Sequence, residues 1–263
     1  MSSAAALRSQ LEAALADRIP SALTPAAKTV RQVVPTGVAA LDTLLDGGLP
    51  VGALTEIIGA ECSGRTTVAL SFLAQITKTE RVCAWIDVSN ALSPESAAAS
   101  GIPLKRLLWV RCGVQPSTRT AKPCASNVWA RIEQALRVTD LLLQAGGFSA
   151  IVLDLGSIAP EHVSRIPLAT WFRYRAAAER SRASVLLLTQ HACSKSSAGL
   201  VLHLQAGQPL SPESTVLAGL ERHVEVSRQR FTEASSKVVP FRKPPQRASR
   251  ADWQSNTAWA GRL

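Results

Sequence analysis

This sequence lacks long apolar runs, paired cysteines and a large share of aromatic residues. No run of about eighteen uncharged apolar residues occurs, and residues 1–18 mix alanine and leucine with charged side chains, so neither a membrane span nor a secretory signal is expected. The five cysteines lie far apart without a C-x-x-C pair, which excludes a cysteine-bound metal and a redox couple. With 46% hydrophobic and 18% charged residues, the chain is too apolar to be disordered. We therefore expect a folded, cytoplasmic protein.

Positive charge is concentrated in the C-terminal part of the chain. The sequence has 29 Lys and Arg against 19 Asp and Glu, a formal net charge of +10, and residues 227–263 contain eight of these cations but only two of the anions. Such a basic segment suits a nucleic-acid backbone or an acidic protein surface, although a solvated tail has the same composition.

Short apolar runs alternate with helix-length patterns through the middle of the chain, which is typical of a mainly parallel twisted sheet flanked by helices. The expected strands are residues 54–58, 82–87, 107–112, 150–155 and 185–190, with 224–230 as the last strand. The expected helices are residues 66–76, 127–144 and 167–182. We predict an α/β core over residues 31–238, a short N-terminal helix and linker over 1–30, and a flexible basic tail over 239–263.

A glycine-rich loop joins the first predicted strand to the next helix. Residues 59–67 have the sequence G-A-E-C-S-G-R-T-T, with the glycines of the phosphate-loop pattern G-x-x-x-x-G-K-[ST]. In such a loop, backbone N–H groups and a helix N-terminus surround a phosphate. The lysine of the pattern is replaced by Arg65, whose planar guanidinium is not an equivalent ligand in a tight site. The pattern predicts a nucleotide fold with weakened chemistry.

A carboxylate follows the apolar run over residues 150–153. Asp154 can hold Mg²⁺ through water, although an Asp at the end of a strand also commonly begins a loop. Because it follows the phosphate loop in the expected order, we interpret it as the carboxylate of a nucleotide fold.

Taken together, these elements resemble the core of bacterial RecA recombinase. The other segments that carry the resemblance are T-G-x-x-x-L-D from Thr36, G-G-L-P-x-G from Gly47, and I-D followed by A-L-S-P from Ile86, and the likeness extends to about Arg230. Within this superfamily, the compact size, the arginine in the loop and the basic tail with proline and tryptophan look most like ImuA-type accessory proteins of the SOS-induced mutasome.

The resemblance implies a site for ATP and Mg²⁺. Gln190 matches the glutamine that links the γ-phosphate to a DNA-binding loop in RecA, although a polar residue at a strand end is an equally good interpretation. The degenerate nucleotide site then comprises Gly59, Ser63, Gly64, Arg65, Thr66, Thr67, Asp154 and Gln190. If a magnesium nucleotide binds, its metal ligands are Thr66 and Asp154.

Three departures from the RecA pattern argue against ATP turnover. Arg65 replaces the lysine, Ser89 stands where a glutamate activates water, and Ser96 stands near the aromatic residue that stacks on adenine. A serine hydroxyl is not a general base at neutral pH. We therefore expect no catalytic residue, and weak or absent binding of ATP and Mg²⁺.

The implied partners are an ImuB-type Y-family-like protein, an error-prone replicative-type DNA polymerase and RecA. The candidate partner-binding residues are Phe241, Arg242, Lys243, Trp253, Trp259, Leu7 and Leu11. Large apolar side chains in a basic tail are typical of a motif that becomes ordered on a partner, the alternative being a strand or helix docked on its own domain. The leucines form an apolar stripe for self-association, RecA capture or a core contact.

Two further segments have alternative interpretations. Helix 167–182 interleaves arginines with aromatic residues and could bind single-stranded DNA, or pack its aromatics on the sheet. The serine-rich connection from residue 191 to 200 is expected to be short, polar and flexible.

We expect a nucleoid-associated accessory protein of SOS-induced, error-prone translesion synthesis. Two alternatives stay open: an active DNA-dependent ATPase or recombinase in which Glu61 activates water, and a SulA-like cell-division inhibitor.

Overall fold

The computed structural model describes residue 6 and residues 31–113, 128–210, 219–230 and 250–256. One compact unit consists of Arg31–Arg230 and Lys243–Leu263, and it contains the candidate site. Several predicted partner-binding residues lie outside the described residues, namely Leu7, Leu11, Phe241, Arg242, Lys243 and Trp259.

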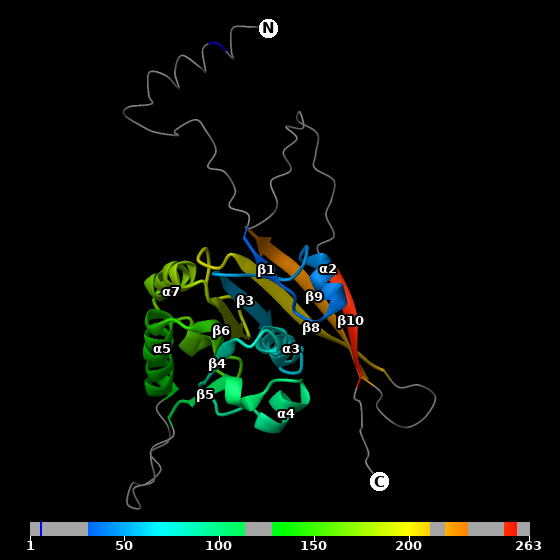
Figure 1. The fold of residues 1–263 in the computed structure, drawn as a ribbon, viewed down its shortest axis with the longest axis horizontal. Coiled ribbons are helices and arrows are strands. Elements are labelled where there is room, and N and C mark those ends of the chain that lie inside the picture. The colour runs from blue at the N-terminus through cyan, green and yellow to red at the C-terminus, as the bar shows by residue number, and fades with distance from the viewer. Residues whose placement is uncertain (1–5, 7–30, 114–127, 211–218, 231–249, 257–263) are drawn as a thin grey trace, which may run out of the picture. The chain divides into compact units, whose positions relative to one another are not determined.

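An eight-stranded, mainly parallel sheet forms the centre of this unit (Figure 1). Its strands are β3 (Leu54–Gly59), β4 (Val82–Asp87), β5 (Leu107–Arg111), β6 (Phe148–Asp154), β7 (Ser184–Thr189), β8 (Leu200–Leu210), β9 (Gly219–Gln229) and β10 (Arg250–Asn256). The order is β10-β9-β8-β3-β7-β6-β4-β5, and β9 alone runs antiparallel to its neighbours within the sheet. A separate antiparallel pair joins β1 (Val33–Val34) to β2 (Leu49–Pro50).

Helices pack on both faces of the sheet (Figure 1). They are α2 (Ala39–Leu44), α3 (Arg65–Lys78), α4 (Pro94–Ala99), α5 (Val128–Ala145), α6 (Pro160–Val163) and α7 (Leu168–Ser181), with a 3-10 turn at Leu104–Arg106. Helices α2, α3 and α4 contribute to one apolar cluster, and α5, α6 and α7 to the other. Within the described residues, no helix has the length and apolar character needed to cross a bilayer.

The central strands are buried on both faces. Neighbouring residues of β3 enter opposite clusters, Ile57 on the α3 side and Ile58 on the α7 side. Every residue of β3 and β7 is buried, which explains the run of four apolar residues in β7, whereas β3 also buries Thr55 and Glu56. The predicted α/β class is confirmed, and strands β3 to β7 and the three longest helices begin and end within two residues of the predicted positions.

The motif T-G-x-x-x-L-D has a structural role. Asp42 Oδ1 accepts the Thr36 N–H at 2.6 Å and the Thr36 hydroxyl at 2.7 Å, and Asp42 Oδ2 accepts the Gly37 N–H at 3.2 Å. Leu41, the preceding residue, is fully buried in the cluster on the α3 side. The motif therefore fixes the turn that leads into α2.

The C-terminal part of the sheet differs from the prediction. Strand β8 is absent from the sequence interpretation, and residues 224–229 of the predicted last strand belong to β9, which is not the last strand. Residues 250–256, expected in a flexible tail, form β10, where Trp253 lies opposite Arg222 of β9 and packs against the α3-side cluster. The tail prediction is wrong for this segment because the edge of β9 supplies backbone partners that no local pattern reveals.

We expect Trp253→Ala to lower the free energy of unfolding by about 2 kcal/mol, because the partly buried indole contacts the core. Urea unfolding of the full chain, followed by circular dichroism, measures this loss. Phe172→Ala is the matched control, since Phe172 is 41% exposed, and should cost less than about 1 kcal/mol. A Trp253→Ala protein as stable as the wild type would contradict the docking of β10.

Candidate functional site

The candidate site lies where four parallel strands end. Strands β3, β7, β6 and β4 are successive in the sheet, so their C-terminal ends lie at one edge. This edge carries the phosphate loop after β3, Ser89 after β4, Asp154 at the end of β6 and Gln190 after β7. The tertiary structure thus brings together the elements that the sequence predicts for a nucleotide site.

The phosphate loop leads directly into α3. Gly64 is the N-cap residue and has a φ of 95°, a left-handed conformation that glycine adopts without strain. Thr66 and Thr67 are exposed in the first turn, whereas Ser63 is buried and its Oγ has no hydrogen-bond partner among the described residues. The predicted arrangement of strand, loop and helix is therefore present.

Arg65 is directed into the protein and is only 8% exposed. Its Nη2 donates a hydrogen bond to the Gly156 carbonyl oxygen at 3.1 Å, and Gln190 Nε2 donates to the same oxygen at 3.0 Å. Gly156 follows β6, so this one carbonyl connects the ends of β3, β6 and β7. The three elements are held together by hydrogen bonds of the protein itself.

Asp154 lies beside the Arg65 guanidinium. A Cβ atom placed on Gly156 would be 3.0 Å from Arg65 Nη1 and 3.0 Å from Asp154 Oδ1, and this oxygen accepts the Gly156 N–H at 2.9 Å. Burial raises the pKa of Asp154 to about 6, and the charge of Asp87, opposite it in β4, adds to the rise. The Gly156 N–H and the arginine lower that pKa in part.

The Arg65 guanidinium is itself affected by burial. Removal from water lowers the pKa of Arg65 from its ordinary value, and the negative charges of Asp154 and Glu61 oppose this change. The side chain is therefore a buried cation whose desolvation is offset only in part by Asp154 and Glu61.

The turn after β4 is built around Asp87, a fully buried residue whose role the sequence analysis missed. Its carboxylate accepts the N–H groups of Ser89 at 3.2 Å, Ala91 at 3.0 Å and Leu92 at 2.9 Å, and the indole N–H of Trp109 at 3.2 Å. The only sequence signal was an apolar strand that ends in Asp. Because these donors occupy both oxygens, Asp87 has a structural role and does not replace the missing glutamate.

Ser96, the residue near the expected adenine-stacking position, is exposed on α4. Its N–H donates to the hydroxyl of Ser93, the N-cap residue of this helix, at 3.1 Å. Ser96 therefore contributes to a helix cap and offers no aromatic face to a base.

The residues of the site fit a phosphate better than they fit a magnesium ion. In the described part of the chain, Ser63 Oγ and Arg65 Nη1 are buried donors without partners, and phosphate oxygens are strong acceptors. The positive charge of Arg65 already acts on Asp154 and would repel a magnesium ion held by that carboxylate. No group of three or more His, Cys, Asp or Glu that could hold a metal occurs in the described ranges.

The connection from β7 to β8 is fixed by a buried carboxylate. Glu56 of β3, only 1% exposed, accepts the N–H groups of Cys193 at 2.7 Å and Ser194 at 3.3 Å, and also the Ser194 hydroxyl. Ser194 and Ser197 are fully buried. The expectation of a flexible loop is wrong because the hydroxyls of Ser194 and Ser197 are turned inward and hydrogen-bonded within the protein.

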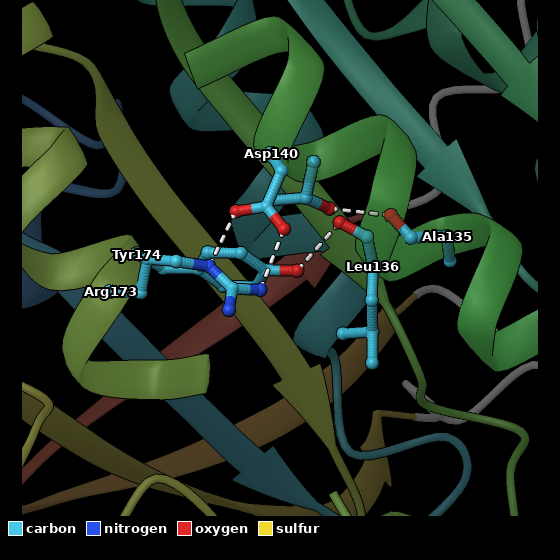
Figure 2. Close-up of polar contacts among 6 residues, drawn as sticks. Ala135, Leu136, Asp140, Arg173 and Tyr174 are labelled. Atoms are coloured by element: carbon cyan, nitrogen blue, oxygen red, sulfur yellow. Dashed lines mark hydrogen bonds and ion pairs between the residues drawn. The ribbon is translucent and has the colours of Figure 1, made fainter. Parts of the chain in front are cut away.

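Arg173 and Tyr174 of α7 form hydrogen bonds with residues of α5 (Figure 2). Tyr174 is buried, packs edge-on against Trp171, and donates its hydroxyl to the Leu136 carbonyl oxygen at 2.7 Å. Arg173 donates two hydrogen bonds to Asp140, at 2.9 and 2.6 Å. The packing interpretation of this helix is therefore favoured over a DNA-binding face.

Comparisons with known proteins agree with this arrangement. The profile of the RecA N-terminal domain matches residues 9–163. Protein RecA of Symbiobacterium thermophilum is 40% identical over 124 residues, 47% of this chain and 31% of that protein. Protein RecA of Methylococcus capsulatus is 41% identical over 123 residues, 46% of this chain and 30% of that protein. The matched region thus spans about a third of the length of these curated relatives.

A solved structure extends the likeness beyond this region. The crystal structure of the RadB recombinase has a TM-score of 0.55 and 19% sequence identity, and covers 85% of this chain and 96% of its own. At this identity the likeness shows the fold, a RecA-like α/β core.

We expect Asp154→Asn to be more stable than the wild type at pH 7.5 by about 2 kcal/mol, because the wild type must ionise a carboxyl whose pKa is raised to about 6. A raised pKa means that stability is lost as the pH rises through 6, so this advantage should vanish as the pH falls toward 4. Urea unfolding between pH 4 and 8 measures the difference.

Glu95→Gln, which removes an exposed carboxylate on α4, is the control. Its difference in unfolding free energy from the wild type should not follow the same change with pH. A stability difference between Asp154→Asn and the wild type that is constant across this pH range would contradict the raised pKa of Asp154.

Proposed function

This chain belongs to the RecA N-terminal domain family, and we propose that it is an accessory protein that holds partners together and does not turn over ATP. The observation that carries this proposal is the bond network at Gly156. Arg65 and Gln190 both donate to its carbonyl oxygen, so the phosphate loop and the end of β7 are joined by hydrogen bonds within the protein. A switch that responds to nucleotide requires these elements to differ between two states, and this network favours a single state.

The missing water-activating group supports the same proposal. Ser89 has no carboxylate, and its N–H is used to satisfy Asp87. In the alternative, an active ATPase, Glu61 would activate water, but this residue is exposed in the loop and its charge acts on Arg65. General-base catalysis supplies roughly 10²–10⁴-fold in rate, so its loss weakens turnover even where a nucleotide binds.

The finer role that we propose is that of an ImuA-type protein in SOS-induced translesion synthesis. Its partners would be an ImuB-type Y-family-like protein and an error-prone replicative-type polymerase, with RecA as a further candidate through the Leu7 and Leu11 stripe. A cytoplasmic, nucleoid-associated location and binding of single-stranded DNA by basic segments belong to the same proposal. The basic charge of residues 227–263 supports contact with nucleic acid or an acidic surface.

We expect the purified full chain to hydrolyse ATP with Mg²⁺ no faster than its Asp154→Ala variant, because neither Arg65 nor Ser89 supplies the chemistry. A phosphate-release assay measures both rates. The double variant Arg65→Lys, Ser89→Glu restores both missing groups and should exceed the wild-type rate by roughly tenfold or more. Steady wild-type hydrolysis that Asp154→Ala abolishes would refute the accessory role.

We expect Phe241→Ala with Trp259→Ala to abolish capture of the ImuB-type partner in a pull-down, since large apolar anchors dominate binding by such motifs. This pair of substitutions leaves β10 intact, whereas deleting the tail from residue 239 would remove that strand as well. Leu141→Ala is the control, because Leu141 is 63% exposed on α5. Undiminished capture by the double variant, with unfolding equal to that of the wild type, would contradict a tail motif.

A further inference from the structure

Buried polar atoms without partners gather around the phosphate loop. Among the described residues, six buried side-chain nitrogen or oxygen atoms lack a hydrogen-bond partner, and three belong to Ser63, Arg65 and Arg222. A fourth, Thr189 Oγ1, is at the end of β7, where Thr189 pairs with Ile58 just before the loop. Burying polar groups without partners is costly, so this concentration indicates a ligand that supplies acceptors.

Arg222 is the charged member of this group that lies outside the phosphate-loop pattern. It comes from β9, is 7% exposed, and forms no ion pair with a carboxylate of the described residues. A Cβ atom placed on Gly64 would lie 2.9 Å from Arg222 Nε and 3.1 Å from Arg222 Cδ. The arginine therefore lies directly against the loop, and any side chain at position 64 would displace it.

The guanidinium groups of Arg222 and Arg65 thus involve strands on opposite sides of β3. Arg222 approaches from β9, and the Arg65 side chain extends to Gly156 after β6, while β3 lies between these strands in the sheet order. The N-terminus of the 14-residue helix α3 lies between them and favours negative charge. Guanidinium groups are well suited to phosphate because their donors form a planar fork.

We propose that Arg222 and Arg65 together hold a pyrophosphate-type anion on this loop without a divalent cation. This inference rests on the proposed function, in which the site does no hydrolysis. The second arginine provides the charge compensation that a magnesium ion would otherwise supply, and the position beside Asp154 already contains a guanidinium. Ser96 offers no ring for a base, so the ligand is recognised by its phosphates, and adenine and guanine nucleotides bind alike.

The test uses the full chain and inorganic pyrophosphate in buffer with EDTA. Thermal unfolding should shift upward with pyrophosphate concentration, and calorimetric titration should give a Kd that added Mg²⁺ does not tighten. Arg222→Gln should weaken this Kd by roughly tenfold or more, because a charge-assisted pair of donors is lost. Lys105→Gln, which removes the same charge at an exposed position, should leave the Kd unchanged.

Arg222→Lys provides a second variant in case Arg222→Gln does not fold. It keeps the charge but loses the fork, so we expect a native circular dichroism spectrum and a Kd between those of the wild type and Arg222→Gln. The inference is overturned if pyrophosphate does not bind, binds only with Mg²⁺, or binds equally well to the folded lysine variant. It is also overturned if single-stranded DNA shifts unfolding through Arg222 and pyrophosphate does not.

This outcome is separable from that of the proposed function. Absence of pyrophosphate binding leaves the accessory role intact, whereas ATP hydrolysis that depends on Asp154 refutes the accessory role whatever the Kd for pyrophosphate.

Discussion

The carbonyl oxygen of Gly156 is the point on which the arrangement of the site depends. It accepts hydrogen bonds from Arg65, the first residue of α3, and from Gln190, which follows β7, and the N–H of the same residue donates to Asp154. Without these bonds, a buried guanidinium and a buried carboxylate would each lose their neighbours at the edge of the sheet. Because uncompensated buried charge is costly, the loop, the β6 end and the β7 end are held in one arrangement.

The replacement of lysine by arginine in the loop explains much of this arrangement. A guanidinium is long and planar enough to reach across to the β6–α6 connection, where it donates to a carbonyl and lies beside a carboxylate. The charge of this guanidinium acts on Asp154, the carboxylate that the sequence resemblance predicts as a metal ligand. The remaining unpartnered donors, including Arg222 Nε, make the loop a site for negative charge.

The fold was largely predictable from the sequence, and the site only in part. Strands such as β6 and β7 bury runs of four apolar residues, so they are evident in the sequence and their bounds are close to prediction. Strand β10 was not predictable, because its pairing is with β9 and residue 253 is a lone large apolar side chain in a polar stretch. The serine-rich connection after β7 was also predicted incorrectly. Its Cys193 N–H and Ser194 hydroxyl donate hydrogen bonds to Glu56, which is distant in the sequence.

By itself, the sequence determined the α/β class, the phosphate loop and the loss of the lysine and glutamate, because these are properties of contiguous residues and fixed spacings. Only the tertiary structure decided where the Arg65 side chain is directed, that Asp87 is a structural carboxylate, and that Arg222 lies against Gly64. The contacts of Arg65 and Arg222 join segments far apart in the chain, whereas Asp87 bonds mainly to the turn that follows it. The energy of a buried charge depends on such neighbours and not on its own sequence position.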